Sequence, residues 1–533
     1  MKKLIAFLCL LLLTQTTNHV LAQTWTRTLD GGASGDDVAY AVAVTPTGEV
    51  VVGASIDRGS HTSCAIIKYT GAGDTMWFRT YDPYPGFDGW VNNIAVTANG
   101  SIFAACGCKD SSSTWAAAVI KLAPDGSIQK EFRYSAPAHV YDCPKDMVLD
   151  HSQNCIVVCD SKTSQDSEDI AVLKLDSAGN PLWVSRYDLS NRYNQANAVD
   201  ADSAGSIYIA GETITSWSEI ASLTKLTPAG ETAWSALYQS PGEQTEFCDV
   251  SVRRCTAFVT GYVSMGTPRI LTARYTDKGD TAWVRELVVG YGVRLATSDS
   301  LGVIVAGCAN DSLTQEDFKT IRYGADGSRK WIARYDGPGH NYDVPSAIAV
   351  SPDGEIYLAG QTRGVSTLSD CATLRYNADG GLLWSARYSG SGSPSIDEGT
   401  AMCLDSLGNV IVAGFATMAS TGEDILLIKY PPTGPGVAEA PRVSIRDWAL
   451  AVSPNPARGR FAVCYDVPRS GRVSVGIYDV SGRLVKPLAA GAVAAGRYSA
   501  GVPRGALPAG TYFVTLVSGV ERMSRKVVLT RAK

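Results

Sequence analysis

Short alternations of apolar and polar residues run along most of the chain, separated by Gly, Asp and Ser. Between residues 331 and 376, the stretches WIARYD, SAIAVS, EIYLAG and ATLRY each alternate in this way. A period of two residues is typical of a strand with one buried face, and joints rich in Gly and Asp are typical of tight turns. The pattern predicts a unit of four short antiparallel strands.

This unit recurs, and a Gly and a Trp separated by three residues mark most of its copies. The spacing is found at Gly73 to Trp77, Gly179 to Trp183, Gly230 to Trp234, Gly279 to Trp283, Gly327 to Trp331 and Gly380 to Trp384. Trp25 opens a further copy, and we assign one more to the segment after Gly126, with Phe132 in place of Trp. Eight copies at intervals of about fifty residues are typical of propellers or solenoids, whose units bury their apolar faces against neighbours.

Two positions of the repeat carry a structural expectation. We expect the Trp to pack between neighbouring units, because a large apolar side chain gains most from burial there. A second Gly ends the strand that follows the turn in most copies and should mark a bulge or a close backbone contact. Its positions are Gly53, Gly107, Gly211, Gly261, Gly307, Gly360 and Gly414, with Asp160 in the remaining copy.

The two ends of the repeat region complement each other. The first copy has only a Trp strand, at residues 24–29, and the last copy ends at residues 424–430 without one. Pairing of these strands would leave no open sheet edge. The sequence therefore predicts an all-β fold, an eight-bladed β-propeller closed by pairing of the N-terminal strand with the last blade.

The chain also carries signals outside the repeat. Lys2 and Lys3 precede an apolar run of about ten residues and a small-residue site at Ala22, which predicts a signal peptide at 1–22. No later apolar stretch approaches the roughly 20 residues of a membrane-spanning helix, so we expect no transmembrane segment. We expect the propeller at 23–432, a linker rich in Pro and Gly at 433–444, and a further β-rich domain at 445–533.

Composition and charge narrow the function. The chain is 45% hydrophobic and 19% charged, as expected of a folded protein. Residues 442–533 carry 15 Lys and Arg against 4 Asp and Glu, a net charge of +11, whereas the mature remainder carries 30 against 48, a net charge of −18. An acidic propeller argues against nucleic acid as a partner, because phosphate binding requires positive charge.

Two resemblances add to this interpretation. Residues 25–55, with Trp25, a Gly-Ser stretch, an apolar strand, a Gly-containing turn and a strand that reaches Gly53, resemble the bacterial β-propeller repeat labelled SBBP. That family is named for seven blades, whereas the repeat count here predicts eight. The resemblance implies a secreted or surface-exposed propeller and assigns no activity.

The C-terminal domain resembles the type A sorting domain of the type IX secretion system. The matching positions are Pro454-Asn455-Pro456, Tyr478-Asp479 with Gly482, and Gly510 with Tyr512. The resemblance implies a small immunoglobulin-like sandwich that contacts the type IX secretion machinery. Together with the signal peptide, it implies export to the cell surface or the extracellular space.

Polar residues that recur in the repeat are candidates for binding. A ring of side chains just before the predicted innermost strands, at the channel mouth, could hold a cation or the hydroxyl groups of a glycan, or could cap loops by accepting backbone N–H groups. Its members are Asp37, Asp88, Asp142, Asn194, Asp343 and Asp397. A second ring could bind anions, or could lay its side-chain stems over the Trp residues. Its members are Lys68, Lys121, Lys174, Lys225, Arg274, Arg322, Arg375 and Lys429.

The cysteines and histidines show no recognisable site. The twelve Cys that follow the signal peptide fall largely on core positions of the repeat, which favours isolated thiols, although one or two disulfides among Cys143, Cys155, Cys248 and Cys255 stay open. No CxxC, HExxH or GxSxG motif is present. We therefore expect neither a metal nor a cofactor.

The sequence thus predicts an exported, non-catalytic propeller that binds a glycan or a protein through its loops. The alternative is a secreted carbohydrate-active enzyme, a glycoside hydrolase or a lyase on the same scaffold, because an Asp or Glu pair for glycoside cleavage needs only proximity in space.

Overall fold

The computed structural model of the chain describes residues 25–434 and 449–530, apart from short gaps at 113, 137–139, 165–166, 190–192, 216–217, 289, 312–313, 366, 458–459, 468–470, 494–495, 504–506 and 519–520. The chain divides into two compact units, Met1–Glu439 and Ala440–Lys533. The predicted signal peptide and most of the predicted linker lie outside the described residues. Those that are described form strands and turns without any α-helix, so the all-β prediction is confirmed.

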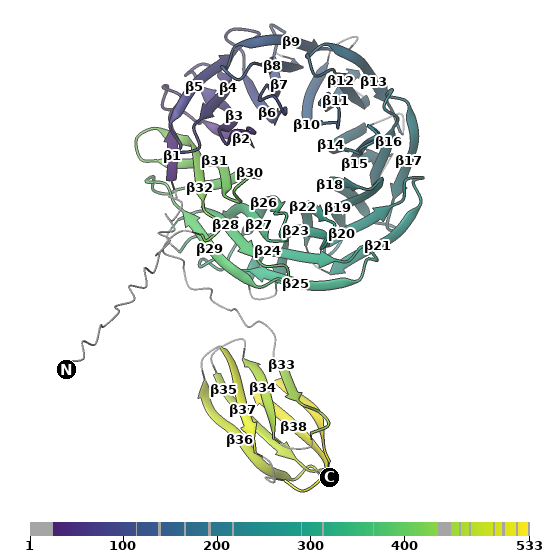
Figure 1. Cartoon of the computed structure of the whole chain (residues 1–533), viewed down its shortest axis with the longest axis vertical. Helices are drawn as coiled ribbons and strands as arrows, with labels where there is room; N and C mark the ends of the chain where they lie inside the picture. Colours follow the sequence, from purple (N-terminus) through teal and green to yellow (C-terminus); the bar gives the residue numbers. More distant parts are fainter. Residues whose placement is uncertain are drawn as a thin grey trace, which may run out of the picture. The chain divides into compact units, whose positions relative to one another are not determined.

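In the first unit, antiparallel runs of four strands surround a central opening (Figure 1). The strands beside the opening are β2 (Val38–Val44), β6 (Gly89–Val96), β10 (Tyr141–Leu149), β14 (Tyr193–Ala201), β18 (Gln244–Arg253), β22 (Tyr291–Ser298), β26 (Asp343–Val350) and β30 (Asp397–Leu404). The second strands are β3 (Val50–Asp57), β7 (Ile102–Lys109), β11 (Cys155–Ser164), β15 (Ile207–Ile214), β19 (Thr256–Ser264), β23 (Gly302–Asp311), β27 (Ile356–Thr362) and β31 (Val410–Met418).

The two remaining strands of each run lie farther from the opening. The third strands are β4 (Thr62–Tyr69), β8 (Trp115–Leu122), β12 (Ser167–Leu175), β16 (Glu219–Leu226), β20 (Arg269–Tyr275), β24 (Thr314–Tyr323), β28 (Asp370–Tyr376) and β32 (Gly422–Tyr430). The outer strands are β5 (Thr75–Tyr81), β9 (Ile128–Tyr134), β13 (Pro181–Tyr187), β17 (Thr232–Tyr238), β21 (Thr281–Val288), β25 (Arg329–Tyr335), β29 (Leu382–Tyr388) and β1 (Trp25–Leu29).

Hydrogen bonding separates these runs into sheets with one exception. The runs β10–β13 and β14–β17 share an eight-stranded sheet, joined by a single parallel pair of Glu168 with Tyr193. The other runs form separate four-stranded sheets. In the last of these, β1 pairs with β32, with Trp25 opposite Lys429. The strand that begins the repeat region therefore forms the outer edge of the sheet that ends it.

The core of the first unit lies between neighbouring sheets. The second and third strands are buried along nearly their whole length, as in β3 and β4, whereas outer strands such as β5 are largely exposed. One apolar cluster joins Val50 and Ile67 of the first sheet to Ile411 and Leu427 of the last. The first and last sheets therefore pack together as the other neighbours do.

Tryptophans of the outer strands connect seven of the eight runs to the next run. The Trp283 ring lies against Gly327, where a Cβ would come within 2.7 Å of Cδ2, and its Nε1 donates to the carbonyl of Ala325 at 3.1 Å. The same contact joins Trp25 to Gly73, Trp77 to Gly126, Trp183 to Gly230, Trp234 to Gly279, Trp331 to Gly380 and Trp384 to Gly434. The predicted packing of Trp between units is confirmed.

The assignment of Phe132 to the Trp position is wrong. In the second run Lys121 pairs with Lys130, just as Lys174 pairs with Trp183 in the third. A Cβ on Gly179 would lie 3.0 Å from the Cβ of Lys130. The aliphatic stem of a lysine therefore takes the place of the indole, and the aromatic residue lies two positions farther along the strand.

A β-bulge interrupts every inner strand at the same level, and it explains the second repeated Gly. In β18 the register shifts between Phe247 and Asp249, directly opposite Gly261. A Cβ on Gly261 would lie 1.9 Å from the carbonyl oxygen of Glu246, and equivalent contacts of 1.8–2.2 Å occur at Gly211, Gly307, Gly360 and Gly414. The predicted bulge or close backbone contact is confirmed at these five positions, because no side chain fits opposite the bulge.

The described cysteines are all free, and most are buried. Cys143 and Cys155 lie in the core, whereas Cys248 and Cys255 are partly exposed. The Sγ atoms of Cys64 and Cys108 are 3.8 Å apart, too far for a disulfide bond. The described cysteines are therefore isolated thiols and form no disulfide bonds with one another.

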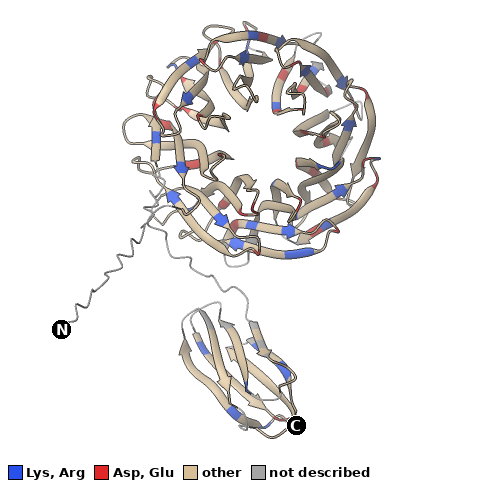
Figure 2. Cartoon of the chain, in the orientation of Figure 1, with Lys and Arg blue, Asp and Glu red and all other residues tan. Residues whose placement is uncertain are grey.

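The second unit is a sandwich of two antiparallel sheets. One sheet holds β33 (Ala449–Ser453), β34 (Phe461–Val467) and β37 (Gly496–Val502); the other holds β36 (Leu484–Val493), β35 (Gly471–Tyr478), β38 (Gly510–Ser518) and β39 (Glu521–Leu529). Val463 of the first sheet and Val475, Val514 and Val527 of the second are fully buried in one apolar cluster. Several Lys and Arg positions lie on the strands of this unit (Figure 2).

Candidate functional site

The predicted ring of polar side chains lies at the loop-side ends of the inner strands, and its members bind their own loops. Asp343 accepts hydrogen bonds from the N–H groups of Gly337 (2.6 Å) and Arg363 (2.9 Å), which precede β26 and follow β27. Asp397 likewise accepts from Gly390 (3.0 Å) and Thr417 (2.9 Å). Burial raises the pKa of both carboxyl groups. This is the loop-capping arrangement.

Three further members have the same role. Asp37 accepts from the N–H groups of Gly31 and Asp57, and Asp142 accepts from Ala136 (2.8 Å) and the hydroxyl of Ser161. Asn194 accepts from Leu189 (3.3 Å) and donates to the carbonyl of Glu168 (3.2 Å). These side chains therefore connect segments within or between adjacent sheets, each at its own loop.

Asp88 differs from the rest of the ring. The residue that aligns with Asp142 and Asp343, two positions before the bulge, is Gly89. Asp88 instead accepts from the N–H of Thr62 (3.2 Å) and pairs with the Lys109 ammonium at 2.7 Å, and the hydrogen bond from Lys109 lowers its pKa. It is therefore a charged group at the edge of the mouth, without a capping role for the loop that precedes β6.

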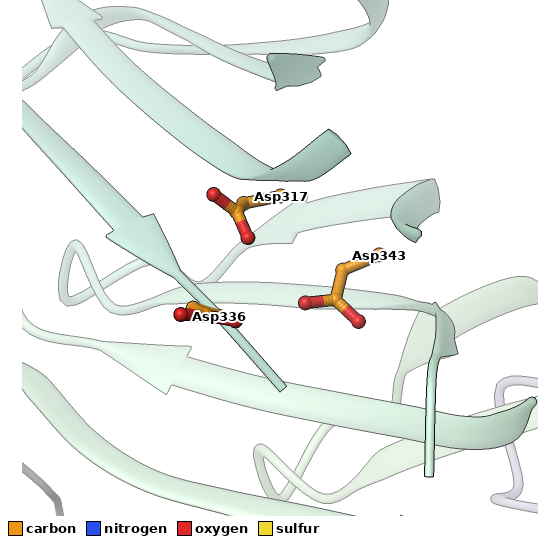
Figure 3. A group of neighbouring side chains, drawn as sticks. All are labelled: Asp317, Asp336 and Asp343. Atoms are coloured by element: carbon orange, nitrogen blue, oxygen red, sulfur yellow. The ribbon is translucent and has the colours of Figure 1, made fainter. Parts of the chain in front are cut away.

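Of the ring, Asp343 is brought beside other carboxylates. Oxygen atoms of Asp317, Asp336 and Asp343 all lie within 4.8 Å of one another, and Figure 3 shows them approaching from three segments. Three carboxylates are the ligand type that Ca²⁺ and Mg²⁺ prefer. The Arg334 guanidinium, however, contacts Asp317 and lies 4.0 Å from Asp336. We therefore interpret the group as an ion-paired joint between β24, β25 and β26.

A pair of carboxyl groups that the repeat pattern did not reveal lies near the loop-side ends of β15 and β18. Glu212 in β15 is 7% exposed, and its Oε2 has no hydrogen-bond partner among the described residues. Burial, and next the charge of Glu246 in β18, raise the pKa of Glu212 to about 8. Glu246 accepts from Asn197 Nδ2 (2.8 Å) and from the Tyr262 hydroxyl. A neutral acid beside a hydrogen-bonded carboxylate is the pairing that acid–base chemistry uses.

The channel wall between the inner strands is also polar. A cavity of about 320 Å³ lies at the level of the bulges, and its lining includes Asn92, Asn93, Lys145, Asp146, Asn197 and Arg294. Asp146 accepts from the N–H of Val199 (2.8 Å), and Asp249 accepts from Leu295 (2.7 Å), in each case on the next inner strand. Burial raises the pKa of Asp249 to about 7. These carboxyls therefore join the runs around the opening.

Aromatic side chains occupy the loop-side ends of several runs. Trp90, at the start of β6, meets Trp115, at the start of β8, edge to face with ring centroids 4.1 Å apart. The Lys109 ammonium lies 4.9 Å from the Trp115 ring centroid. Tyr262 and Tyr291 form a similar edge-to-face pair at 5.0 Å. Clustered aromatics with a few charged groups are typical of ligand sites.

Two members of the ring of basic residues, Lys68 and Arg375, lie opposite the Trp of their own run, as the second of the two predicted alternatives requires. Arg375 contacts the carbonyl of Pro432, the same oxygen to which Trp384 Nε1 donates at 3.2 Å. Lys68 and Trp77 share the carbonyl of Pro124 at 3.2 and 3.1 Å. The cation and the indole therefore bind the same turn of the next run.

In the C-terminal unit, the predicted motif residues form hydrogen bonds that stabilise turns and attach a segment to the edge strand β39. Asn455 donates to the carbonyl of Lys526 (2.8 Å) and accepts from the N–H of Val528 (3.0 Å), which ties the Pro454-Asn455-Pro456 segment to β39. Pro454 also lines a cavity of about 470 Å³ with Phe461. Tyr512, near the start of β38 and two residues after Gly510, donates to the carbonyl of Pro508 at 3.0 Å, as the Tyr of an immunoglobulin-type tyrosine corner does.

The hairpin between β35 and β36 contains the remaining motif residues. Tyr478 ends β35, and Asp479 accepts from the N–H groups of Ser481 and Arg483, both at 3.0 Å. Hydrogen bonds from Ser481 and Arg483 lower the pKa of Asp479 to about 2. Gly482 has a φ of 82°, which a residue with a Cβ rarely adopts.

Comparison with protein families agrees with this geometry. Residues 451–530 match the secretion system C-terminal sorting domain. The C-terminal unit is a secretion sorting domain. Residues 351–382, from the turn before β27 to the start of β29, match a β-propeller domain of unknown function, DUF5122. The sorting domain implies export by the type IX system to the cell surface or the extracellular space and contact with its machinery.

Comparison with individual proteins adds little on function. No curated protein matches the chain. Three solved structures are similar at low identity: a protein of unknown function from Bacteroides caccae (TM-score 0.32, 11% identity, 66% of this chain and 93% of that one), one of unknown function from Dyadobacter fermentans (0.37, 9%, 76% and 97%), and the polysaccharide lyase Uly1 (0.39, 11%, 74% and 90%). At these TM-scores the similarities support no functional argument. Within the described residues, no helix is long and apolar enough to cross a membrane.

Proposed function

We propose that the chain is an exported, eight-bladed β-propeller that binds an extracellular glycan at the loop-side mouth of its opening without cleaving it. The eight runs of four strands, the pairing of β1 with β32 and the apolar cluster shared by the first and last sheets support a closed ring of eight blades. Closure removes exposed strand edges and keeps the loops in fixed positions.

The domain boundaries follow from the same proposal. The propeller spans residues 23–432, and a linker at 433–444 leads to a sorting domain at 445–533, with a signal peptide at 1–22. The sorting domain takes the chain through the outer membrane by the type IX machinery, and the propeller is the part that acts outside the cell. The change from an acidic propeller to a basic tail supports this division of roles.

The partly buried Trp90–Trp115 pair carries the binding proposal. The indole faces of such a pair can pack against the apolar faces of sugar rings, and the neighbouring Lys109 and Asp88 can form hydrogen bonds with hydroxyl groups. Four of the ring carboxyls then serve mainly to hold the loops, and Asp88 is the ring member that can contact ligand.

A secreted carbohydrate-active enzyme is the second candidate, and the Glu212–Glu246 pair favours it. An uncharged carboxyl group can donate a proton to a leaving oxygen while an ionised neighbour acts as base or nucleophile. Both groups lie on strands of the sheets, Glu212 on β15 and Glu246 on β18. The two candidate functions differ in whether the bound glycan is released uncleaved or cleaved.

The test follows binding and cleavage in the same samples. The full mature chain is applied to a glycan array and incubated with a panel of soluble polysaccharides, and new reducing ends or unsaturated products are measured. The proposal predicts a bound glycan that stays intact, with binding about tenfold weaker in Trp115→Ala. Leu237→Ala, which removes an apolar side chain 52% exposed on the outer strand β17, should bind as the unchanged chain does.

Cleavage that Glu212→Gln or Glu246→Gln abolishes would instead establish the enzyme. Equal binding by the Trp115→Ala and Leu237→Ala variants would show that the aromatic pair is not the site.

A further inference from the structure

A cavity in the first unit lies at the opposite ends of the inner strands from the loop-side mouth, and its lining is cationic. It has a volume of about 530 Å³ and extends between the runs β18–β21 and β22–β25. Its cations are Arg253, Arg254, Arg274, Arg322 and Lys330, and its carboxylates are Asp299 and Asp326. A lining with three more positive than negative groups is unusual in an acidic propeller.

The surplus charge arises where the repeat departs from its own pattern. In several other runs the basic residue of the third strand pairs with a carboxylate from the turn between the first two strands. Examples are Lys174 with Asp150 (3.0 Å), Lys429 with Asp405 (3.0 Å) and Arg375 with Glu355 (3.1 Å). In the β18–β19 turn, Arg253-Arg254-Cys255-Thr256 replaces that acidic turn. The turn that should neutralise Arg274 therefore brings two further arginines.

The arginines are held in place from several directions. Arg274 donates from Nη1 to the carbonyl of Ala325 (2.8 Å) and lies over the Phe258 ring, whereas its buried Nε has no partner among the described residues. Arg322 donates to the carbonyls of Leu301 (2.9 Å) and Ala378 (2.9 Å). Fixed guanidinium groups bind oxyanions with little further loss of conformational entropy.

The β18–β19 turn has an unusual backbone conformation, and the Arg254 side chain at this turn is exposed. Arg254 and Cys255 have φ angles of 51° and 57°, a left-handed conformation that side chains other than Asn, Asp and Gly rarely adopt in a two-residue hairpin turn. Arg254 is 81% exposed and shares Asp299 with Arg253, at 3.2 and 2.7 Å. One carboxylate thus orients two guanidinium groups and cannot neutralise both.

We propose that this pocket binds a small oxyanion, the sulfate or phosphate group of a ligand such as a substituted sugar. Guanidinium groups match the oxygens of such anions with paired hydrogen bonds. The volume is within the usual range for small-molecule sites. The pocket is separate from the mouth, so it binds whether or not a glycan is held there.

The test uses the full mature chain and titration calorimetry at low ionic strength, with inorganic pyrophosphate and inorganic sulfate as probes. Saturable binding of one equivalent is expected, weakened about fivefold or more in Arg254→Ser. Arg483→Ser is the matched control, because Arg483 is 79% exposed and pairs with a single Asp at 3.2 Å in the other unit. Since screening weakens such pairs, added salt should also lower the affinity.

A second arm identifies the source of the anion. Tighter binding of a sulfated disaccharide than of inorganic sulfate would assign the anion to a substituted sugar, and equal binding would assign the pocket to the free ion. Absence of saturable binding to every probe would overturn the proposal. Equal losses in the Arg254→Ser and Arg483→Ser variants would also overturn it, because they would reveal general charge attraction instead of a pocket.

Discussion

At the scale of single residues, one contact is repeated around the first unit and accounts for much of its spacing. An indole lies on a Gly of the next run, and its N–H reaches the carbonyl two residues before that Gly. Full burial of an indole, about 200 Å² at about 25 cal/mol/Å², gives an upper bound of about 5 kcal/mol. The Gly is required because a Cβ would enter the ring.

Removal of one indole should therefore be costly. Trp384 is 2% exposed and lies on Gly434, so Trp384→Ala should lower the free energy of unfolding by about 3–5 kcal/mol. Its neighbour Leu383 is 39% exposed, and Leu383→Ala should cost less than about 1 kcal/mol. Urea unfolding of both variants measures the difference, and similar losses would contradict the contact.

The buried carboxyl of Glu212 gives a prediction on pH. Its folded-state pKa, about 8, lies above its ordinary value of 4.5, so the folded chain holds this proton more tightly than the unfolded chain does. The resulting stabilisation is complete below pH 4.5 and is lost as the pH rises to about 8. Glu212→Gln should remove on the order of 5 kcal/mol of this dependence.

The measurement is denaturant unfolding across that pH range. Glu231→Gln, at an exposed turn, is the control and should keep the pH dependence of the unchanged chain. A Glu212→Gln variant with the same pH profile as the control would show that the carboxyl is not buried as described.

At the scale of elements, the inner strand with its bulge and the second strand opposite it form the repeated joint. The bulge turns a carbonyl toward the second strand, and only Gly leaves space for it at five of the positions. In the first sheet Ala54 occupies the equivalent position, opposite the bulge between Ala39 and Ala41. The joint therefore tolerates a side chain in some runs and excludes it in others.

This difference predicts unequal losses of stability for two substitutions. Gly414→Ala would place a Cβ 1.8 Å from the Glu398 carbonyl oxygen and should lower the unfolding free energy by about 2 kcal/mol or more. Ala54→Gly removes a tolerated Cβ and should cost about 1 kcal/mol or less. Thermal unfolding of the pair tests this, and a neutral Gly414→Ala would contradict the register of β30 with β31.

Periodicity in the sequence was sufficient to predict the strands, the Trp contacts and the Gly at the bulge, because each depends on neighbours at a fixed spacing. Periodicity does not predict Lys130 at the Trp position, because Phe132 two residues later has the expected aromatic character whereas Lys130 has the expected spacing. The Glu212–Glu246 pair could not be found, because its members lie on different sheets and occur once. The Arg253-Arg254 turn could have been found from the sequence, because these arginines stand where several other copies of the repeat have an acidic residue.

The predicted ring of polar side chains also shows that recurrence in the sequence does not identify ligand-binding residues. Asp37 and Asp343 stood out because they recur, yet recurrence reflects the loops that they cap. Residues that bind a ligand need not repeat, and Trp90 and Trp115 interrupt the pattern instead. Deviations from the repeat are therefore the better guide to function.

At the scale of the whole molecule, the two units have separate tasks. The C-terminal sandwich is a secretion sorting domain, and its motif residues maintain its turns and its last strand. Deletion of residues 445–533 should leave the propeller folded but retained in the periplasm, because the sorting signal is lost. Cell fractionation measures this, with Asn455→Ala as a milder variant, and normal surface delivery of the truncated chain would contradict it.

Closure of the first unit is the central claim, because the loop-side mouth and the channel exist only if the last sheet meets the first. Hydrogen exchange of the mature chain, followed by mass spectrometry, tests it directly at β32. The account predicts that β32 is as protected as the third strand β28, and that deletion of residues 25–29 makes β32 exchange rapidly. Rapid exchange of β32 in the intact chain, or no change on that deletion, would show that β1 does not close the ring.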